Sequence, residues 1–165
     1  MTHEFGNPKN PQVILIHGFG GSAMIFFRLF KRLKENYHVI MIDLLGMGCS
    51  SRPKFLAKTK YEAEMYYVQS IEEWRKKMKL DKMNLAAHSF GGYVASRYTL
   101  KHPDRVNKLI LWSPHGTEPK PEQYEENMRA RMDIDKKFKC FIKIMLCIFK
   151  HELKPLNCIR CCGRC

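Results

Sequence analysis

The chain has 165 residues, of which 45% are apolar and 27% charged, a composition that describes one globular domain and excludes a disordered chain. Lys and Arg number 29 against 16 Asp and Glu, which gives a formal net charge of +13. The charge alone decides nothing, because it suits a surface drawn to anionic lipid headgroups as well as it suits nucleic acid. No recognised nucleic-acid motif accompanies it, so we expect no nucleic-acid partner.

The N-terminal residues MTHEFGNPKNPQ are polar and contain no apolar stretch of the kind that a secretory signal requires. No apolar run approaches the ~18 residues of a membrane-spanning helix. Seven cysteines are present, and four of them crowd the end of the chain: Cys158, Cys161, Cys162 and Cys165. Without a signal peptide a disulfide framework is the weaker interpretation, and we expect an intracellular protein.

Four near-continuous apolar runs are typical of buried strands in a parallel sheet that is covered on both faces. They are VILIHG (13–18), HVIMIDL (38–44), MNLAAH (83–88) and KLILWSP (108–114). Helical patterns lie between them, at 22–35, 62–79 and 91–101. The apolar stripe of the first pattern consists of Ala23, Phe26, Phe27, Phe30 and Leu33. The alternation predicts an α/β fold with a parallel sheet flanked by helices.

After Pro114 the sequence becomes polar and punctuated by proline. We therefore divide the chain into a core, 1–116, and a C-terminal helical segment with a Cys-rich tail, 117–165. Residues 136–150 predict a basic amphipathic helix that lies on a membrane, closes over a lipid site or packs on its own domain. For the tail, zinc binding, palmitoylation and an unselected sequence all remain open.

Ser89 stands where the run 83–88 passes into the helical pattern 91–101. Small residues at Ala87 and Gly91 allow a sharp turn there, so the stretch Ala87-His88-Ser89-Phe90-Gly91 predicts a nucleophile elbow with Ala87 in place of the first glycine. The alternative is a serine that only caps a helix. We predict that Ser89 is a nucleophile.

The stretch HGFGG, from His17 to Gly21, follows the first apolar run. Its glycines, Gly18 and Gly20 among them, allow backbone N–H groups to point at a developing oxyanion. We expect the N–H groups of Phe19 and Phe90 to form such a hole. The stretch lacks the residues of a phosphate-binding loop, so we expect no nucleotide, no other cofactor and no metal.

Three further residues near these motifs are candidates for a catalytic base or acid. Asp43 follows the second apolar run, and we expect it to cap local backbone rather than to act as the acid. His88 adjoins Ser89 but should point elsewhere on the elbow. His17 is more plausible as a brace of the glycine-rich turn than as a base.

Together, LIHGFGG, MIDLLGMGCSSRPKF, NLAAHSFGGYVASRY and KLILWSPHG resemble the α/β-hydrolase-fold lipid enzymes over residues 13–116. The most similar branch contains the N-acyl-phosphatidylethanolamine lysophospholipase, the cardiolipin deacylases and the lipid-droplet coactivator of triglyceride lipase. The resemblance implies an acyl-ester lipid substrate, an acyl-serine intermediate, a lid after the fourth run and a cytoplasmic protein that can attach to membranes or lipid droplets. Some members lack the serine, whereas this chain has Ser89.

The resemblance also implies two opening strands, for which the first ten residues leave little room, and an acid and a histidine beyond the lid. We therefore expect an incomplete hydrolase, and His102, His115 and His151 do not follow strands at the expected place. The competing hypothesis is a non-catalytic lipid-surface or interaction protein that keeps the elbow. Acyl transfer to lysophosphatidate through a His-x4-Asp motif is less favoured, because its only match, His38 to Asp43, falls in a strand.

Overall fold

A computed structural model describes residues 1–116 and, beyond them, 122–124, 126–127, 129–130, 135, 139–140 and 143. The chain divides into two units, Met1–Pro119 and Lys120–Cys165. In the second unit, two hydrogen bonds with helical spacing are present: Asn127 N–H to the Gln123 carbonyl and Lys139 N–H to the Asp135 carbonyl. The lid-like segment, most of the amphipathic stretch 136–150 and the Cys-rich tail lie outside the described residues and remain predictions.

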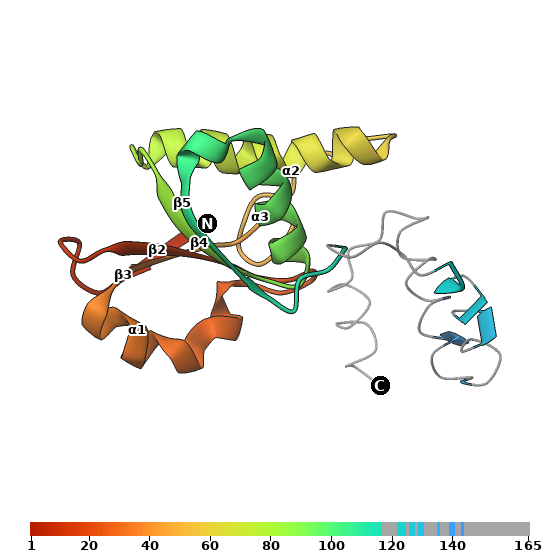
Figure 1. The fold of residues 1–165 in the computed structure, drawn as a ribbon, viewed down its shortest axis with the longest axis horizontal. Coiled ribbons are helices and arrows are strands. Elements are labelled where there is room, and N and C mark those ends of the chain that lie inside the picture. The colour runs from red at the N-terminus through yellow and green to blue at the C-terminus, as the bar shows by residue number, and fades with distance from the viewer. Residues whose placement is uncertain are drawn as a thin grey trace. The chain divides into compact units, whose positions relative to one another are not determined.

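The first unit is built on a five-stranded sheet with the order β1-β3-β2-β4-β5 (Figure 1). The strands are β1 (Thr2–Phe5), β2 (Gln12–Ile16), β3 (His38–Ile42), β4 (Met83–His88) and β5 (Val106–Trp112). β2, β3, β4 and β5 are parallel to their neighbours in this group, so the four apolar runs are the predicted parallel strands.

The first ten residues hold one strand, β1, whereas the expectation was that they leave little room for two opening strands. It pairs antiparallel with β3, from Thr2 opposite Ile42 to Phe5 opposite Val39. The segment THEF shows neither a continuous apolar run nor a clear alternation, because an edge strand of four residues is only partly buried. Backbone pairing with β3 places it in the sheet, and its side chains add contacts with Trp74, which donates to the Thr2 hydroxyl, and with the Phe30 ring, which stacks on Phe5.

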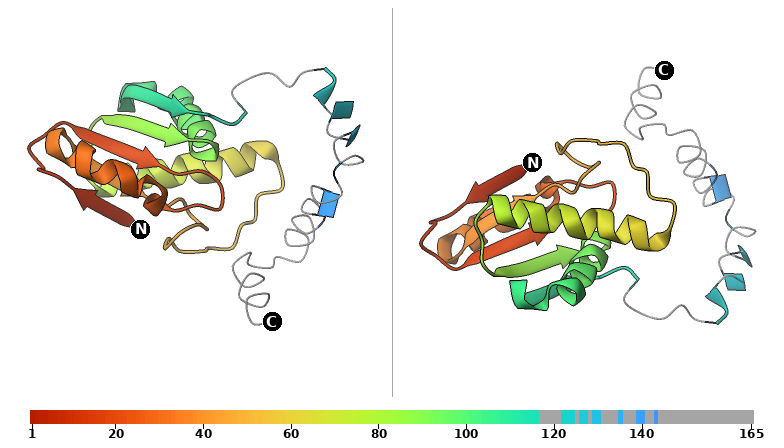
Figure 2. Two further views of the ribbon diagram at one scale, coloured as in Figure 1. Left: turned by 90° about the horizontal axis from the view of Figure 1, so that it is seen from below. Right: turned by 90° about the horizontal axis from the view of Figure 1, so that it is seen from above.

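Helices cover both faces of the sheet (Figures 1 and 2). The 3₁₀ helix η1 (Ala23–Leu29) and α1 (Phe30–Asn36) lie on one face, and α2 (Lys60–Lys77) and α3 (Phe90–Lys101) lie on the other. A short 3₁₀ turn, η2 (Pro103–Arg105), leads into β5. α2 starts with a capping box, in which Thr59 accepts from the Glu62 N–H and Glu62 accepts from the Thr59 N–H.

The helical stripe predicted for 22–35 is correct except at Phe27. Ala23 and Phe26 are buried, and Phe30 and Leu33 are half-buried against the sheet, but Phe27 is 59% exposed. The first two turns are 3₁₀ rather than α, with three residues per turn, so residues three apart share a face and Phe27 rotates outward.

The core has two parts, one on each face of the sheet. Between the sheet and α2 and α3 lie Ile14, Ile16, Ile40, Leu85, Ala87, Val68, Ile71, Val94 and Tyr98, with others. Between the sheet and η1 and α1 lie Leu15, Val39, Met41, Ala86, Ala23 and Phe26. Alternate residues of each central strand therefore face opposite helix layers, and this confirms the α/β fold. Within the described residues, no helix is long and apolar enough to cross a membrane.

Candidate active site

Ser89 joins β4 to α3 in a backbone conformation that few residues adopt. Its φ is +53° and its ψ is −118°. A non-glycine residue with positive φ costs energy and persists only where the surroundings hold it. Here the Ser89 N–H donates to the Trp112 carbonyl at 3.0 Å, and the Ser89 carbonyl accepts from the N–H groups of Tyr93 and His115. Backbone contacts to α3 and to the end of β5 thus fix the turn.

The side chain of Ser89 does not cap the helix. Ser89 occupies the position before Phe90, where a serine oxygen usually accepts a hydrogen bond from the first turn of a helix. No such side-chain hydrogen bond is present. The alternative interpretation, a serine kept only for its cap, therefore lacks the contact that it requires, and the strained strand–turn–helix geometry is that of a nucleophile elbow.

Gly91 and Gly92 allow this turn by their lack of a side chain. A Cβ on Gly91 would stand 2.7 Å from the Ile16 carbonyl oxygen, and one on Gly92 would stand 3.0 Å from Cβ of Pro114. Ala87, the small residue at the start of the motif, is fully buried in β4. The close packing of α3 on β2 and on the end of β5 therefore requires small residues at these positions.

The glycine-rich turn after β2 lies next to Ser89. A Cβ on Gly18 would stand 3.1 Å from Cβ and 3.5 Å from Oγ of Ser89. The rings of Phe19 and Phe90 meet edge to face with centroids 6.0 Å apart. Phe90 is the first residue of α3, so its N–H has no acceptor within the helix. The structure thus brings together Gly18, Phe19, Ser89 and Phe90. The role of the Phe19 and Phe90 N–H groups as an oxyanion hole stays a prediction.

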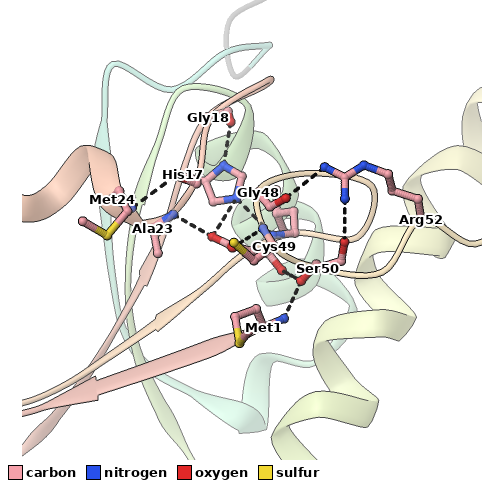
Figure 3. Close-up of polar contacts among 12 residues, drawn as sticks. Met1, His17, Gly18, Ala23, Met24, Gly48, Cys49, Ser50 and Arg52 are labelled. Atoms are coloured by element: carbon pink, nitrogen blue, oxygen red, sulfur yellow. Dashed lines mark hydrogen bonds and ion pairs between the residues drawn. The ribbon is translucent and has the colours of Figure 1, made fainter. Parts of the chain in front are cut away.

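His17 links this turn to the loop after β3 (Figure 3). Its ring is fully buried, Nδ1 lies 2.7 Å from the Gly18 carbonyl oxygen, and Nε2 lies 3.1 Å from the Leu44 backbone nitrogen. A carbonyl can only accept and an N–H can only donate, so Nδ1 carries the proton and Nε2 accepts. With both ring nitrogens committed to the backbone, His17 has none left for a proton transfer with Ser89.

Burial lowers the pKa of His17, although the hydrogen bond to Gly18 and the nearby Asp43 carboxylate both act to raise the pKa. The Asp43 Oδ1 lies 3.8 Å from Nε2 of His17. Because Nε2 already accepts from the Leu44 N–H, the ring is neutral and this approach is not an ion pair.

Asp43 holds two loops by their backbones. Oδ1 accepts from the Ala23 N–H at 2.6 Å, and Oδ2 accepts from the Cys49 N–H at 2.7 Å. The Asp43 backbone carbonyl also accepts from the Ser50 hydroxyl at 2.6 Å, and Figure 3 shows Ala23, Cys49 and Ser50 gathered here. Asp43 therefore caps backbone, and its link to Ala23, twenty positions earlier in the chain, had no signal in the local sequence.

The described histidines do not supply a base for Ser89. Within the described part of the chain, no side-chain hydrogen bond joins Oγ of Ser89 to a histidine, and the hydrogen bond of His115 to Ser89 comes from its backbone N–H. Nδ1 of His88 is buried without a hydrogen-bond partner. His102 follows α3, and its ring lies tilted against that of Tyr98 with centroids 5.0 Å apart. His151 lies outside the described residues.

The His38 to Asp43 match does not form a catalytic unit. His38 begins β3 and its Nε2 lies 3.0 Å from the Glu4 carboxylate, whereas Asp43 follows the other end of the strand. Five positions along an extended strand span ~16 Å.

A cavity of about 110 Å³ between α2 and α3 contains a polar cluster that the sequence did not reveal. The buried Glu64 accepts from the Tyr93 hydroxyl and pairs with Arg97 at 2.7 Å. The Tyr93 hydrogen bond, followed by Arg97 and Lys60, holds the pKa of Glu64 below its usual value against the effect of burial. Phe90, next to the nucleophile candidate, lines the same cavity.

In the described residues, no group of three or more His, Cys, Asp and Glu could hold a metal ion.

The fold and the elbow define a class of protein, and the sequence matches it. Residues 11–138 match the family model of the alpha/beta hydrolase fold, and the chain belongs to this family. It is 44% identical over 126 residues to a rice protein (Oryza sativa subsp. japonica) named probable 1-acylglycerol-3-phosphate O-acyltransferase, and 44% identical over 127 residues to the human 1-acylglycerol-3-phosphate O-acyltransferase ABHD5. These matches cover 76% and 77% of the chain but only 30% and 36% of the relatives, so the chain spans about a third of their length.

Solved structures agree with the fold. A bacterial membrane phospholipase A superposes with a TM-score of 0.66 at 31% identity, over 78% of this chain and 41% of that one. A marine microorganism esterase superposes with a TM-score of 0.62 at 23% identity, over 79% and 48% of the two chains. The second likeness shows the fold alone.

Proposed function

We propose that this chain carries the nucleophile and the oxyanion hole of a serine hydrolase that acts on acyl esters of lipids. The observation that carries the proposal is Ser89, held at φ +53° between β4 and α3 with its side chain not used as a cap and with Gly18 against it. Ser89 is half-buried, and backbone strain of this kind is typical of functional residues. The names of the rice, human and bacterial proteins, which concern acyl groups on lipids, support the substrate class.

In the proposed reaction, Oγ of Ser89 attacks the acyl carbonyl carbon and its proton passes to a general base. Negative charge then develops on the carbonyl oxygen, where the N–H groups of Phe19 and Phe90 stabilise it by about 3 kcal/mol each. Collapse of this intermediate breaks the ester C–O bond and leaves an acyl-serine, and the base returns its proton to the departing alcohol oxygen. Water then hydrolyses the acyl-serine to the fatty acid and the free serine. The described residues provide neither the base nor the acid that orients it, and without them a serine loses most of its reactivity.

Fluorophosphonate labelling tests the proposal, since the probe phosphonylates activated serines. We expect slow labelling of the 165-residue chain that increases when imidazole is added as an external base, and no labelling of Ser89→Ala. Ser113→Ala is the matched control, because Ser113 also has positive φ, at +42°, at the end of a strand. Labelling that is unchanged in Ser89→Ala, or absent at all imidazole concentrations, would favour the alternative of a non-catalytic lipid-surface protein.

Acyl transfer is the second candidate, and the names of the rice and human relatives favour it. Both reactions share the acyl-serine and differ only in whether water or the hydroxyl of lysophosphatidate receives the acyl group. A chain preloaded with a labelled acyl ester would distinguish them: free fatty acid indicates hydrolysis, and labelled phosphatidate indicates transfer.

A further inference from the structure

The outer side of η1 exposes three large apolar side chains in consecutive turns. Met24 is 56% exposed, Ile25 46% and Phe27 59%, while Ala23 and Phe26 point inward and are buried. In a 3₁₀ helix residues three apart share a face, so Met24 and Phe27 form one outward row beside Ile25. Single exposed apolar residues are ordinary, but a contiguous group indicates a site of interaction.

Basic residues border this apolar group. Arg28, Lys31 and Arg32 are exposed, and none of them pairs with a carboxylate in the part of the chain that the structure describes. The guanidinium of Arg28 lies 5.8 Å from the centroid of the Phe27 ring. We call these six residues, Met24, Ile25, Phe27, Arg28, Lys31 and Arg32, the η1 surface. Apolar side chains with adjacent unpaired cations match an anionic bilayer, which has an acyl interior beneath phosphate headgroups.

The η1 surface adjoins the predicted site. η1 begins two residues after the glycine-rich turn, and a Cβ on Gly21 would stand 3.6 Å from Cγ2 of Ile25. Phe19, in the same turn, is 52% exposed. Figure 1 shows η1 and α1 on one face of the sheet, with α2 and α3 on the opposite face. A membrane against the η1 surface would therefore lie beside the turn that is predicted to receive the acyl carbonyl.

We propose that the η1 surface docks the protein on an anionic phospholipid bilayer. Nucleic acid would pair with the cations but would leave Met24, Ile25 and Phe27 without apolar contact. A second copy would cover the apolar group but would bring two sets of unpaired cations together. The proposal extends the proposed function by naming the surface from which the lipid arrives, and it rests on that function only for the chemistry at Ser89.

Sedimentation with vesicles tests this surface in the full 165-residue chain. The vesicles consist of diether phosphatidylcholine alone or mixed with diether phosphatidylglycerol, lipids that contain no ester to hydrolyse. Two variants remove the two parts of the surface, Ile25→Ser/Phe27→Ser and Arg28→Glu/Lys31→Glu. The control, Leu100→Ser/Lys101→Glu, makes the same kinds of change at exposed positions of α3 on the other face of the sheet.

We expect both η1 variants to bind anionic vesicles on the order of tenfold more weakly than the unchanged chain, and the control to bind as tightly as the unchanged chain. Salt should weaken the binding of the unchanged chain more than that of Arg28→Glu/Lys31→Glu. Residues 136–150 are identical in all variants, so any contribution from them does not affect the comparison. Since the substituted side chains are exposed, all variants should melt at the temperature of the unchanged chain.

Binding of both η1 variants equal to that of the unchanged chain would overturn the proposal. So would a change in oligomeric state of Ile25→Ser/Phe27→Ser in analytical ultracentrifugation with vesicle binding intact, because the surface would then be an interface between copies. Failure of Ser89 to react with a fluorophosphonate contradicts the proposed function and leaves vesicle binding untouched, so the two hypotheses fail separately.

Discussion

Gly91 lies against the carboxyl end of β2, so close that a Cβ added to it would stand 2.7 Å from the carbonyl oxygen of Ile16. It also approaches the carbonyl oxygen of His17, the first residue of the glycine-rich turn. These neighbours are backbone atoms at the end of a central strand and at the start of the turn after it, and they cannot rotate away as a side chain would. The contact sets how near α3, and with it Ser89, can come to the turn that carries Phe19.

Gly91→Ala should therefore destabilise the protein by about 2–3 kcal/mol, although alanine in a helix is ordinarily about 1 kcal/mol more favourable than glycine. Urea unfolding measures the change. Gly46→Ala is the control, since nothing lies within 4 Å of its Cβ and only its φ of +80° is unfavourable, at a cost of about 1 kcal/mol. A Gly91→Ala protein as stable as the original would show that α3 has room to move.

Asp43→Asn should destabilise the fold by about 2–3 kcal/mol. The carboxylate is buried and accepts from two backbone N–H groups, of Ala23 and Cys49, whereas an amide has one oxygen and leaves one N–H facing its nitrogen. The control is Asp81→Asn, which removes an exposed ion pair with Arg105 and should cost less than about 1 kcal/mol. Equal unfolding midpoints of the two variants would refute the role of Asp43.

The contacts of Glu72 predict that the folded protein loses stability in acid. Arg75 binds it through two hydrogen bonds of 2.8 Å and the Tyr98 hydroxyl donates to it at 2.7 Å, and these contacts lower the pKa of Glu72 to about 2. The folded pKa lies below the unfolded one, so this stabilisation is complete above the unfolded pKa, near 4.5, and disappears as pH falls toward 2.

Glu72→Gln should cost about 1–2 kcal/mol at neutral pH and should flatten the decline of stability between pH 5 and pH 2. Thermal unfolding across that range measures both effects. The control is Glu73→Gln, a substitution at the exposed neighbouring residue. Its stability should decline with falling pH as steeply as that of the original chain. If the stability of Glu72→Gln declined between pH 5 and pH 2 as steeply as that of the original chain, other carboxyl groups would have to cause the decline.

His17 should remain neutral at pH values where a free histidine is already charged. Its burial lowers its pKa, so the folded state binds a proton less readily than the unfolded state, and stability should decrease as pH falls below the ordinary histidine range. Nitrogen NMR of the ring should show a protonated Nδ1 and an unprotonated Nε2. His17→Asn identifies the signal, and a ring protonated at Nε2 would contradict the hydrogen bonds to Gly18 and Leu44.

The sharp turn at Ser89 was predictable because its causes are local. An apolar run, a serine and two small residues in succession already require a sharp turn between a buried strand and a helix, and Ser89 adopts positive φ there. The exposure of Phe27 was not predictable in this way, since the stripe Ala23, Phe26, Phe27, Phe30 fits an α-helix equally well. Only the 3₁₀ geometry of η1 rotates Phe27 outward.

The sequence by itself determined the parallel strands and the helices between them, because continuous apolar runs and helical stripes are consequences of burial on both faces of a sheet. Tertiary structure decided what depends on pairing between distant segments. The segment Thr2–Phe5 becomes a strand through backbone bonds to β3, and Asp43 reaches the Ala23 N–H only once β2 and β3 lie side by side. These hydrogen bonds involve backbone groups, which nearly every residue has. The sequence of residue types therefore does not indicate which of these groups will pair.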